Sequence, residues 1–281
     1  MRTLAALLIS GLFLNAQTTA SQEKGKALVD QVVAALGGDY FLAMRNRVET
    51  GRVYSFYREQ LTGLSIAKIY TQYDINKTPD DTKLHVRERQ AFGKKEDSAV
   101  LFLEDSGYQV GYRGAKPIPE ETIKRYTSTA RNSIFYILLE RLKEPGMLID
   151  ARGSEIIDNV PTDKVDFTDA DNNVVSVYFA KSTHLPVKQV HVRRDPETKY
   201  PIQEVTVFTK FRDIGHGVMW PFNMLRLRDG EKAYEIFAEN VVINQDLAAK
   251  LFELPSGAKI IDDSQDRKLN PLPTKTKKDP K

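Results

Sequence analysis

A run of oxygen-bearing side chains in the middle of the chain has the spacing with which a calcium-binding loop begins. Asp169, Asp171 and Asn173 occupy alternate positions, but such a loop also needs Gly at its sixth position and a bidentate Glu at its twelfth. Those positions hold Val174 and Ala180. Valine resists the sharp turn, and alanine offers no oxygen. Because β-branched and aromatic residues flank the cluster on both sides, we interpret it as the turn of a β-hairpin.

Residues typical of catalytic or zinc sites do not occur in the required patterns. The four histidines form no HExxH pair and have no carboxylate at metal-ligand spacing. The chain has no cysteine, which excludes thiol catalysis, and no G-x-S-x-G motif, the nearest stretch being GLSIA around Ser65. We therefore expect no metal, no cofactor and no catalytic residue, and predict that the chain is not an enzyme. A pair of distant carboxylates, as in glycosidases, remains an open alternative.

The N-terminal residues have the composition of a secretory signal peptide. Arg2 supplies a positive charge, an apolar run follows, and the small residues Ala16 and Ala20 suit a cleavage site. The sequence predicts a signal peptide over residues 1–20, with an uncleaved anchor as the alternative. Since the chain has no cysteine, it carries neither a disulfide nor a lipidated N-terminal Cys. We expect a soluble, non-lipidated protein exported to the periplasm.

Charge is unevenly distributed along the chain. The net charge is +3, and residues 264–281 alone contribute six basic and two acidic side chains. Once this stretch and Arg2 are set aside, the remaining body is slightly acidic, which argues against a nucleic-acid partner. The C-terminal stretch is rich in Pro and Lys and poor in apolar residues. We expect residues 263–281 to be a disordered tail, and we assign 21–262 to one folded domain.

Apolar periodicity predicts one helix followed by a long series of strands. In "KALVDQVVAALGG" the apolar residues from Leu28 to Leu36 share a helical face, and two glycines suit the helix end. From residue 48 onward, β-branched and aromatic stretches alternate with turns, the first of them expected around Thr62-Gly63. About a dozen strands in meander order predict a mainly β (α+β) protein with a single large curved antiparallel sheet.

A helical segment interrupts the strands between Pro119 and Pro145. Apolar residues such as Ile134, Phe135 and Leu138 cover more than one of its faces, and such a helix must be buried on more than one face. It is therefore either an enclosed core helix or a lid whose second face meets a ligand. The stretch 129–142 is the candidate lid.

The second half of the chain carries three loose motifs that suggest a known family. A Leu-Pro pair restarts a strand, a Gly-containing turn is followed by Pro, and an Asn-capped short helix ends in Phe-x-x-Pro. These are Leu185-Pro186, Gly217 with Pro221, and Asn244 with Phe252 and Pro255. Together with the order of helix, strand pair, helical insertion and meander, they give residues 24–256 a pattern that resembles the outer-membrane lipoprotein-sorting protein family, the LolA-like carriers.

This resemblance implies an unclosed half-barrel of about eleven strands, with a few helices covering its concave side. It also implies a periplasmic binding and carrier protein for a hydrophobic ligand. A lipid, or the acyl chains of a lipoprotein, would lie in the apolar concavity under a helical lid, and membrane-bound donor and acceptor proteins would exchange it. We expect the carrier to be a monomer.

Large apolar residues of the predicted strands and of the helical segment are the candidates to line the ligand cavity. They are Phe56, Ile134, Phe135, Leu138, Phe179, Phe208, Trp220 and Phe222. For each of them, burial in an ordinary core is the alternative. The competing functional hypothesis is a periplasmic sensor or scaffold module with the same fold, which binds a partner protein and carries no lipid.

Overall fold

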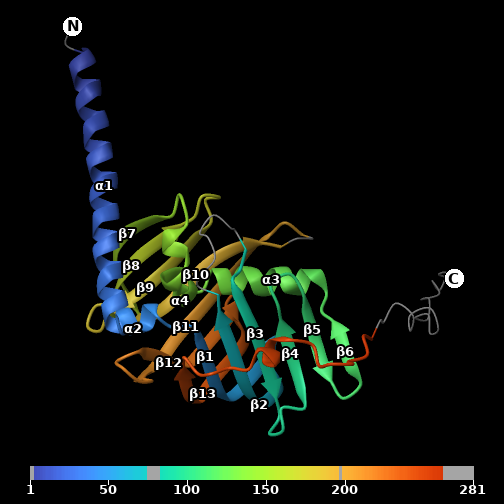
Figure 1. The fold of residues 1–281 in the computed structure, drawn as a ribbon. Helices are drawn as coiled ribbons and strands as arrows, with labels where there is room; N and C mark the ends of the chain where they lie inside the picture. Colours follow the sequence, from blue (N-terminus) through green and yellow to red (C-terminus); the bar gives the residue numbers. More distant parts are fainter. Residues whose placement is uncertain (1–2, 75–82, 196–197, 262–281) are drawn as a thin grey trace, which may run out of the picture.

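The computed structural model describes residues 3–74, 83–195 and 198–261, with side chains from residue 20 onward. Within this part of the chain one antiparallel sheet dominates, and helices lie against it (Figure 1). The predicted tail 263–281 and Arg2 of the predicted signal peptide lie outside the described residues.

In the described part of the chain thirteen strands form one continuous, open sheet, where the family resemblance implied about eleven. All neighbouring strands pair antiparallel. In chain order they are β1 (Asn46–Tyr57), β2 (Gln60–Tyr73), β3 (Val86–Phe92), β4 (Ser98–Phe102), β5 (Gly107–Gly111), β6 (Gly114–Pro117), β7 (Leu148–Ile157), β8 (Val160–Thr168), β9 (Val174–Ala180), β10 (Pro186–Arg194), β11 (Pro201–Asp213), β12 (Met219–Arg228) and β13 (Glu231–Ile243). The predicted fold class, a mainly β unclosed half-barrel, is confirmed.

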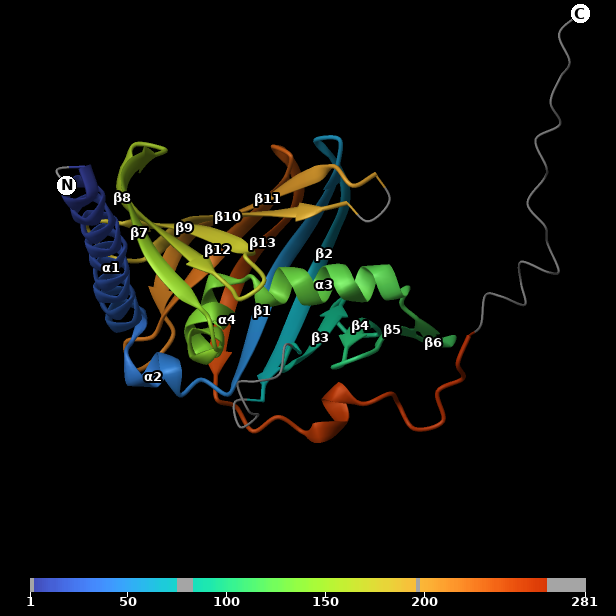
Figure 2. The same cartoon turned by 90° about the horizontal axis from the view of Figure 1, so that it is seen from above.

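The order of strands in the sheet explains why helices cross its concave side. Neighbours in the sheet are neighbours in the chain, except that β1 pairs with β13. That pairing joins two meanders, β1–β6 and β7–β13, and leaves β6 and β7 as the two edges of the sheet. The segment 118–147 connects these edges, so its helices must bridge the open half-barrel (Figure 2).

Over residues 3–74, 83–195 and 198–261, four helices and two 3₁₀ segments accompany the sheet. The helices are α1 (Thr3–Leu36), α2 (Asp39–Leu42), α3 (Glu120–Arg131) and α4 (Ile134–Leu139), and the 3₁₀ segments are η1 (Arg141–Lys143) and η2 (Ala249–Phe252). Among the described residues, no helix combines the length and the apolar character needed to cross a membrane.

The first hairpin turns four residues earlier than the sequence indicated. Arg58 and Glu59 both have positive φ, of 48° and 60°, which is the geometry of a tight two-residue hairpin turn. Thr62 and Gly63 lie inside β2 instead. A Cβ at Gly63 would come 2.5 Å from the Ser55 hydroxyl across the strand pair, and the register shifts just beside it. The glycine thus marks a bulge and close approach within a strand.

The turn predicted at residues 169–173 is confirmed as the link between β8 and β9. The Asp169 carboxylate accepts hydrogen bonds from the backbone N–H groups of Asp171 and Asn173, at 3.1 and 2.9 Å. Arg141 donates to the other carboxylate oxygen at 3.0 Å. The oxygen-rich spacing therefore serves an Asx-type turn.

The helical segment consists of two helices with a sharp break, where the sequence suggested one helix through 129–142. At the break, the buried Gln189 of β10 replaces the missing helical hydrogen bonds. Its side-chain amide donates to the Asn132 carbonyl, and its side-chain oxygen accepts from the Ile134 N–H, both at 2.9 Å. Because Gln189 satisfies these backbone groups, the chain can turn α4 into the core while α3 continues across the sheet.

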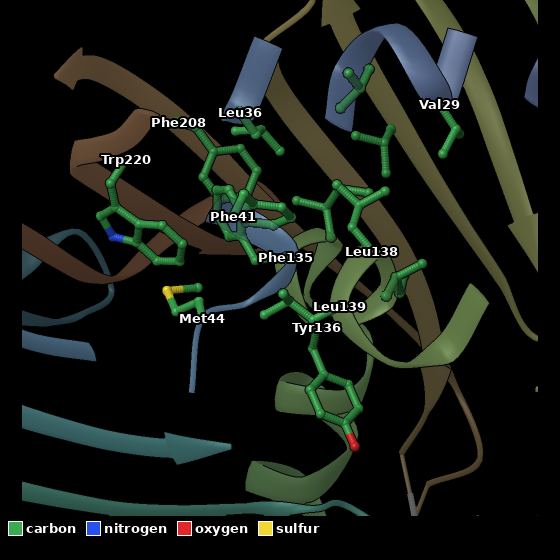
Figure 3. Close-up of a cluster of buried hydrophobic side chains, with 14 of the residues drawn as sticks. Val29, Leu36, Phe41, Met44, Phe135, Tyr136, Leu138, Leu139, Phe208 and Trp220 are labelled. Carbon is green, nitrogen blue, oxygen red and sulfur yellow. The ribbon is translucent and has the colours of Figure 1, made fainter. Parts of the chain in front are cut away.

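Side chains of α1, α2 and α4 fill one half of the concavity (Figure 3). Every residue of α4 is buried. The cluster includes Val29, Val32, Leu36, Phe41, Met44, Ile134, Phe135, Leu138, Val177, Phe179, Phe208, Trp220 and Phe222. Of the two alternatives that the sequence left open, α4 is therefore the enclosed core helix.

The α1 helix also covers the β7 edge of the sheet. Gly25 lies so close to β7 that a Cβ there would come 2.5 Å from the Ile149 carbonyl oxygen. The Ser21 hydroxyl donates to the Ala151 carbonyl at 2.9 Å. Since an exposed edge strand invites pairing with another chain, this contact protects the half-barrel against sheet extension.

The convex face carries a smaller core of its own. Val48, Tyr70, Ala91 and Ala99 lie on the opposite side of β1–β4 from the concavity, and Phe252 of η2 packs onto them. The chain after β13 thus runs along the outside of the sheet, as Figure 2 shows. Both faces of this half of the sheet are covered.

Candidate ligand cavity

A cavity of about 510 Å³ lies under α3, beside the filled half of the concavity. Strands β1–β3 and β11–β13 form its walls, and α3 forms its roof. Apolar side chains that line it are Phe56, Ile69, Val86, Phe102, Phe135, Trp220, Met224, Leu227 and Ile236. Charged and polar side chains from the same elements interrupt this apolar wall. The cavity is therefore amphipathic.

A buried ion pair lies at the deep end of the cavity. Arg47 and Glu49 approach to 3.1 Å, with side chains only 9% and 2% exposed. The Trp220 indole N–H donates to Glu49 at 2.8 Å, and the Arg47 guanidinium lies 4.2 Å from the centre of the Trp220 ring. Burial alone would lower the pKa of Arg47, but Glu49 and Tyr73 outweigh it and raise the pKa above its ordinary value. Arg47 is therefore always cationic.

Two further polar groups of the cavity keep their protons more firmly than usual. Burial raises the pKa of Glu88, although Gln90 donates to its carboxylate at 2.6 Å. Burial, together with the nearby Glu88, raises the pKa of Tyr126 well above its ordinary value. The Tyr126 hydroxyl is buried without a hydrogen-bond partner. The Tyr126 hydroxyl can therefore donate a hydrogen bond to a polar ligand atom.

The roof helix α3 is attached at a few points only. None of its residues is fully buried. The ring of Tyr126 stacks on Phe102 with centroids 3.7 Å apart, and the Thr129 hydroxyl lies 3.4 Å from Glu204. At its C-terminal end, Arg131 binds the Lys83 carbonyl and Glu144 at 2.9 and 2.8 Å. These contacts hold α3 over the cavity without building it into the core.

Glu204 of β11 links the roof to the wall. Arg193 donates to one of its oxygens at 2.7 Å, and His191 Nε2 lies 3.4 Å from the other. Burial alone would raise the pKa of Glu204, but His191 and Arg193 outweigh it and lower the pKa to about 2. The carboxylate is thus firmly ionised and already provided with donors.

A second, more open hollow of about 1030 Å³ lies along another side of α3. Its charged side chains largely neutralise one another: Arg131 and Arg141 both bind Glu144, and Arg141 also binds Asp169 at 3.0 Å. Within the described part of the chain, no group of three or more acidic or histidine side chains is arranged to hold a metal ion. The cavity under α3 is therefore the candidate site.

The structure divides the eight predicted lining residues into two groups. Phe56, Phe135 and Trp220 line the cavity under α3. The others belong to the filled core around α4, and they are Ile134, Leu138, Phe179, Phe208 and Phe222. Sequence reasoning could not separate the groups, because large apolar residues mark concave positions whether a helix fills the space above them or not. Contact of any of the eight with a ligand stays a prediction.

Sequence reasoning missed the polar members of the site. Arg47 and Glu49 of β1 and Glu88 of β3 all line the cavity on the concave side. One signal was available: the stretches "NRVET" and "VRERQ" place charged residues within otherwise strand-like sequence. On a half-barrel, such positions are as consistent with a polar cavity as with a solvated face.

The sequence matches no protein-family model and no curated protein. Solved structures with a similar fold do exist. A domain named for outer membrane lipoprotein sorting, from Vibrio parahaemolyticus, is 11% identical, with a TM-score of 0.53 over 83% of this chain and 97% of that one. A DUF1329 family protein from Desulfovibrio piger is 14% identical, with a TM-score of 0.56 over 83% and 98% of the two chains.

A LolA superfamily protein from Nitrosomonas europaea is 12% identical over 80% of this chain and 97% of that one, with a TM-score of 0.47. At these identities similarity speaks for the fold alone, and the assignment rests on the first two structures. Each of these two structures is covered almost completely by this chain, at 97% and 98% of its length. The chain has the LolA-like fold of outer-membrane lipoprotein-sorting domains.

Proposed function

We propose that the protein binds one amphiphilic lipid or acyl chain in the cavity under α3 and carries it through the periplasm. The observation that supports this proposal is the cavity itself, whose apolar walls end in buried polar groups beneath a lightly attached helix. Its volume of about 510 Å³ falls within the roughly 300–1,000 Å³ of pockets that take a single small molecule. The LolA-like fold is in keeping with such a role.

The energetics of acyl-chain burial suit a carrier. Each methylene group removed from water contributes about 0.8 kcal/mol, so a chain of ~16 carbons gains roughly 10 kcal/mol. Binding of this strength holds a lipid in water but opposes its release. A carrier therefore needs a part that opens and an acceptor that takes the ligand.

The helix α3 is the part that we propose to open. It forms the roof of the cavity and is attached by the Tyr126 stack and by polar contacts of Thr129 and Arg131. The helix α4, in contrast, is enclosed on every side. In this proposal α3 swings away at a membrane-bound donor or acceptor, and no covalent chemistry takes place.

The first test is native mass spectrometry of the mature protein, purified from a periplasmic extract without detergent. We expect an adduct with the mass of an acyl lipid, which organic extraction removes. An unliganded mass that persists after incubation with membrane vesicles would contradict the carrier role. Stoichiometric recovery of one partner protein without lipid would favour the sensor or scaffold hypothesis instead.

A matched pair of variants locates the ligand. Thr206 and Thr209 lie on the same strand, but only Thr206 lines the cavity, whereas Thr209 is exposed. Thr206→Trp should fill the cavity and abolish the lipid adduct, while Thr209→Trp should retain it. Circular dichroism confirms that both variants fold. Equal retention of the adduct by two folded variants would place the ligand elsewhere.

A further inference from the structure

Three arginines line the open end of the cavity under α3. Arg125 of α3 and Arg226 and Arg228 of β12 line the cavity and are exposed. In the part of the chain that the structure describes, none of the three forms an ion pair or a side-chain hydrogen bond. Arg226 lies over the Tyr234 ring, 6.0 Å from its centre, and its charge acts to lower the pKa of Glu88, against the burial that raises it.

The three carboxylates that line the cavity are already provided with donors. Glu49 forms an ion pair with Arg47 and accepts a hydrogen bond from the Trp220 indole N–H. Glu88 accepts hydrogen bonds from the Thr71 hydroxyl and the Gln90 side-chain amide. Glu204 accepts hydrogen bonds from the Arg193 side chain and the Thr129 hydroxyl, and it also faces His191. Each acid thus has hydrogen-bond donors other than the three arginines at the open end, although Arg226 also acts electrostatically on Glu88. Arg228 lies opposite Glu204 and Glu231 on the neighbouring strands.

Backbone geometry places these arginines together. Arg226 and Arg228 are two residues apart on one strand, so both point to the concave side, roughly 7 Å from each other. The register between β12 and β13 shifts beside Arg226 and leaves Ala233 of β13 as the extra residue, and both Ala233 and Leu227 also line the cavity. Thr129, one helical turn after Arg125, contacts Glu204, whose strand position pairs with Arg228. Arg125 therefore faces the same end of the cavity.

A second, independent observation lies deeper in the cavity. The Arg47 side chain is only 9% exposed, and its Nε has no hydrogen-bond partner among the residues that the structure describes. The Tyr126 hydroxyl is likewise buried and unpartnered. Buried donors without acceptors are costly unless a ligand satisfies them. Arg47 and Tyr126 thus add two buried donors to those that line the cavity.

We infer that the ligand is a single-chain amphiphile with an anionic head, a carboxylate or a phosphate monoester, whose head binds Arg125, Arg226 and Arg228 while its chain lies along the apolar wall. This inference rests on the proposed function and names its ligand class. Planar guanidinium groups bind carboxylate and phosphate with two parallel hydrogen bonds, which suits this pairing.

The test compares ligands with the same chain and different heads. Palmitate, hexadecyl phosphate, hexadecanol and hexadecyltrimethylammonium compete with a neutral fluorescent acyl probe for the full-length protein. The two anions should bind at least about tenfold more tightly than the alcohol, as expected of one charge-assisted contact, and the cation should bind most weakly. The preference for anions should decrease as salt is added, because the arginines are exposed.

Matched variants assign the effect to residues. Arg226→Gln and Arg228→Gln should each reduce the preference for palmitate over hexadecanol severalfold and leave the affinity for hexadecanol unchanged. Arg45→Gln is the control, because Arg45 is exposed and lies outside the cavity lining. It should keep the full preference.

Each other outcome overturns the inference in a distinguishable way. Equal binding of anions and alcohol by the wild-type protein would refute the anionic head and leave the proposed function intact. Failure of all four C16 ligands to bind would refute both the anionic head and the proposed function. Displacement of palmitate by inorganic phosphate at the same concentration would assign the arginines to a free anion and not to an amphiphile.

Discussion

Trp220 shows how one side chain can serve both the core and the cavity. Its ring packs against Phe135 of α4, with centroids 4.3 Å apart, while its indole N–H binds Glu49. The aromatic body contributes apolar burial and the polar end satisfies a buried carboxylate, a combination for which tryptophan is well suited. Trp220 therefore belongs both to the closed core and to the candidate site.

Glu204 makes a pH-dependent contribution to stability. Its pKa is about 2 in the folded protein, against an ordinary value of 4.5. A lowered carboxyl pKa stabilises the fold at pH values above the ordinary value, and this contribution is lost as the pH falls towards 2. We expect Glu204→Gln to lower the free energy of unfolding by about 1–3 kcal/mol at pH 7, and by much less near pH 2.5. Urea denaturation at both pH values measures the difference, and a difference independent of pH would contradict this account.

At the scale of elements, the break between α3 and α4 assigns two roles to one helical segment. The six residues of α4 are buried in the core, whereas α3 has no buried residue. Gln189 makes the division possible by satisfying the backbone at the break. A strand side chain thus decides where a helix ends.

The two helices should differ sharply in their contribution to stability. Leu138 of α4 is 2% exposed, so Leu138→Ala should cost about 2–5 kcal/mol and Leu138→Asp should prevent folding, because it buries an unpaired charge. Ile123 of α3 is only partly buried, so Ile123→Ala should cost less than about 1 kcal/mol. Chemical denaturation compares the two alanine variants. Equal losses would mean that α4 is not the core helix.

At the scale of the whole molecule, the half-barrel depends on devices that keep its sheet from extending. The edge β7 is covered by α1, and the other edge, β6, forms a bridge between Ala115 and Ile260 of the C-terminal segment. An open sheet with two protected edges suits the monomer that we expect.

Separation of α1 from β7 should therefore change the oligomeric state. Gly25→Val would bring side-chain atoms against the Ile149 carbonyl and push α1 away from the edge strand. We expect dimers or larger species in light scattering, together with faster amide exchange along β7. The control is Lys26→Val, which places the same β-branched residue at an exposed position of the same helix. A monomeric Gly25→Val protein with protected β7 amides would contradict this role of α1.

The sequence by itself determined the strand-rich character, the single antiparallel sheet and the turn at Asp169, because period-two alternation and turn residues act locally. The open half-barrel class followed from the resemblance to the lipoprotein-sorting family. It misplaced the first hairpin turn, because Gly63 marks a bulge and not the turn. The apolar residues of α4 indicated that the helix is buried on several faces. They did not distinguish burial by protein from burial by a ligand.

Only the tertiary structure decided which part of the concavity is filled and which part is open. The pairing of β1 with β13 and the bridging of the two sheet edges by 118–147 are long-range contacts that no local pattern encodes. The placement of three arginines at the open end of the cavity likewise depends on long-range contacts. The local sequence around a charged strand residue is the same whether that residue faces water or a ligand. The groups that lie opposite it in the fold belong to a distant part of the chain.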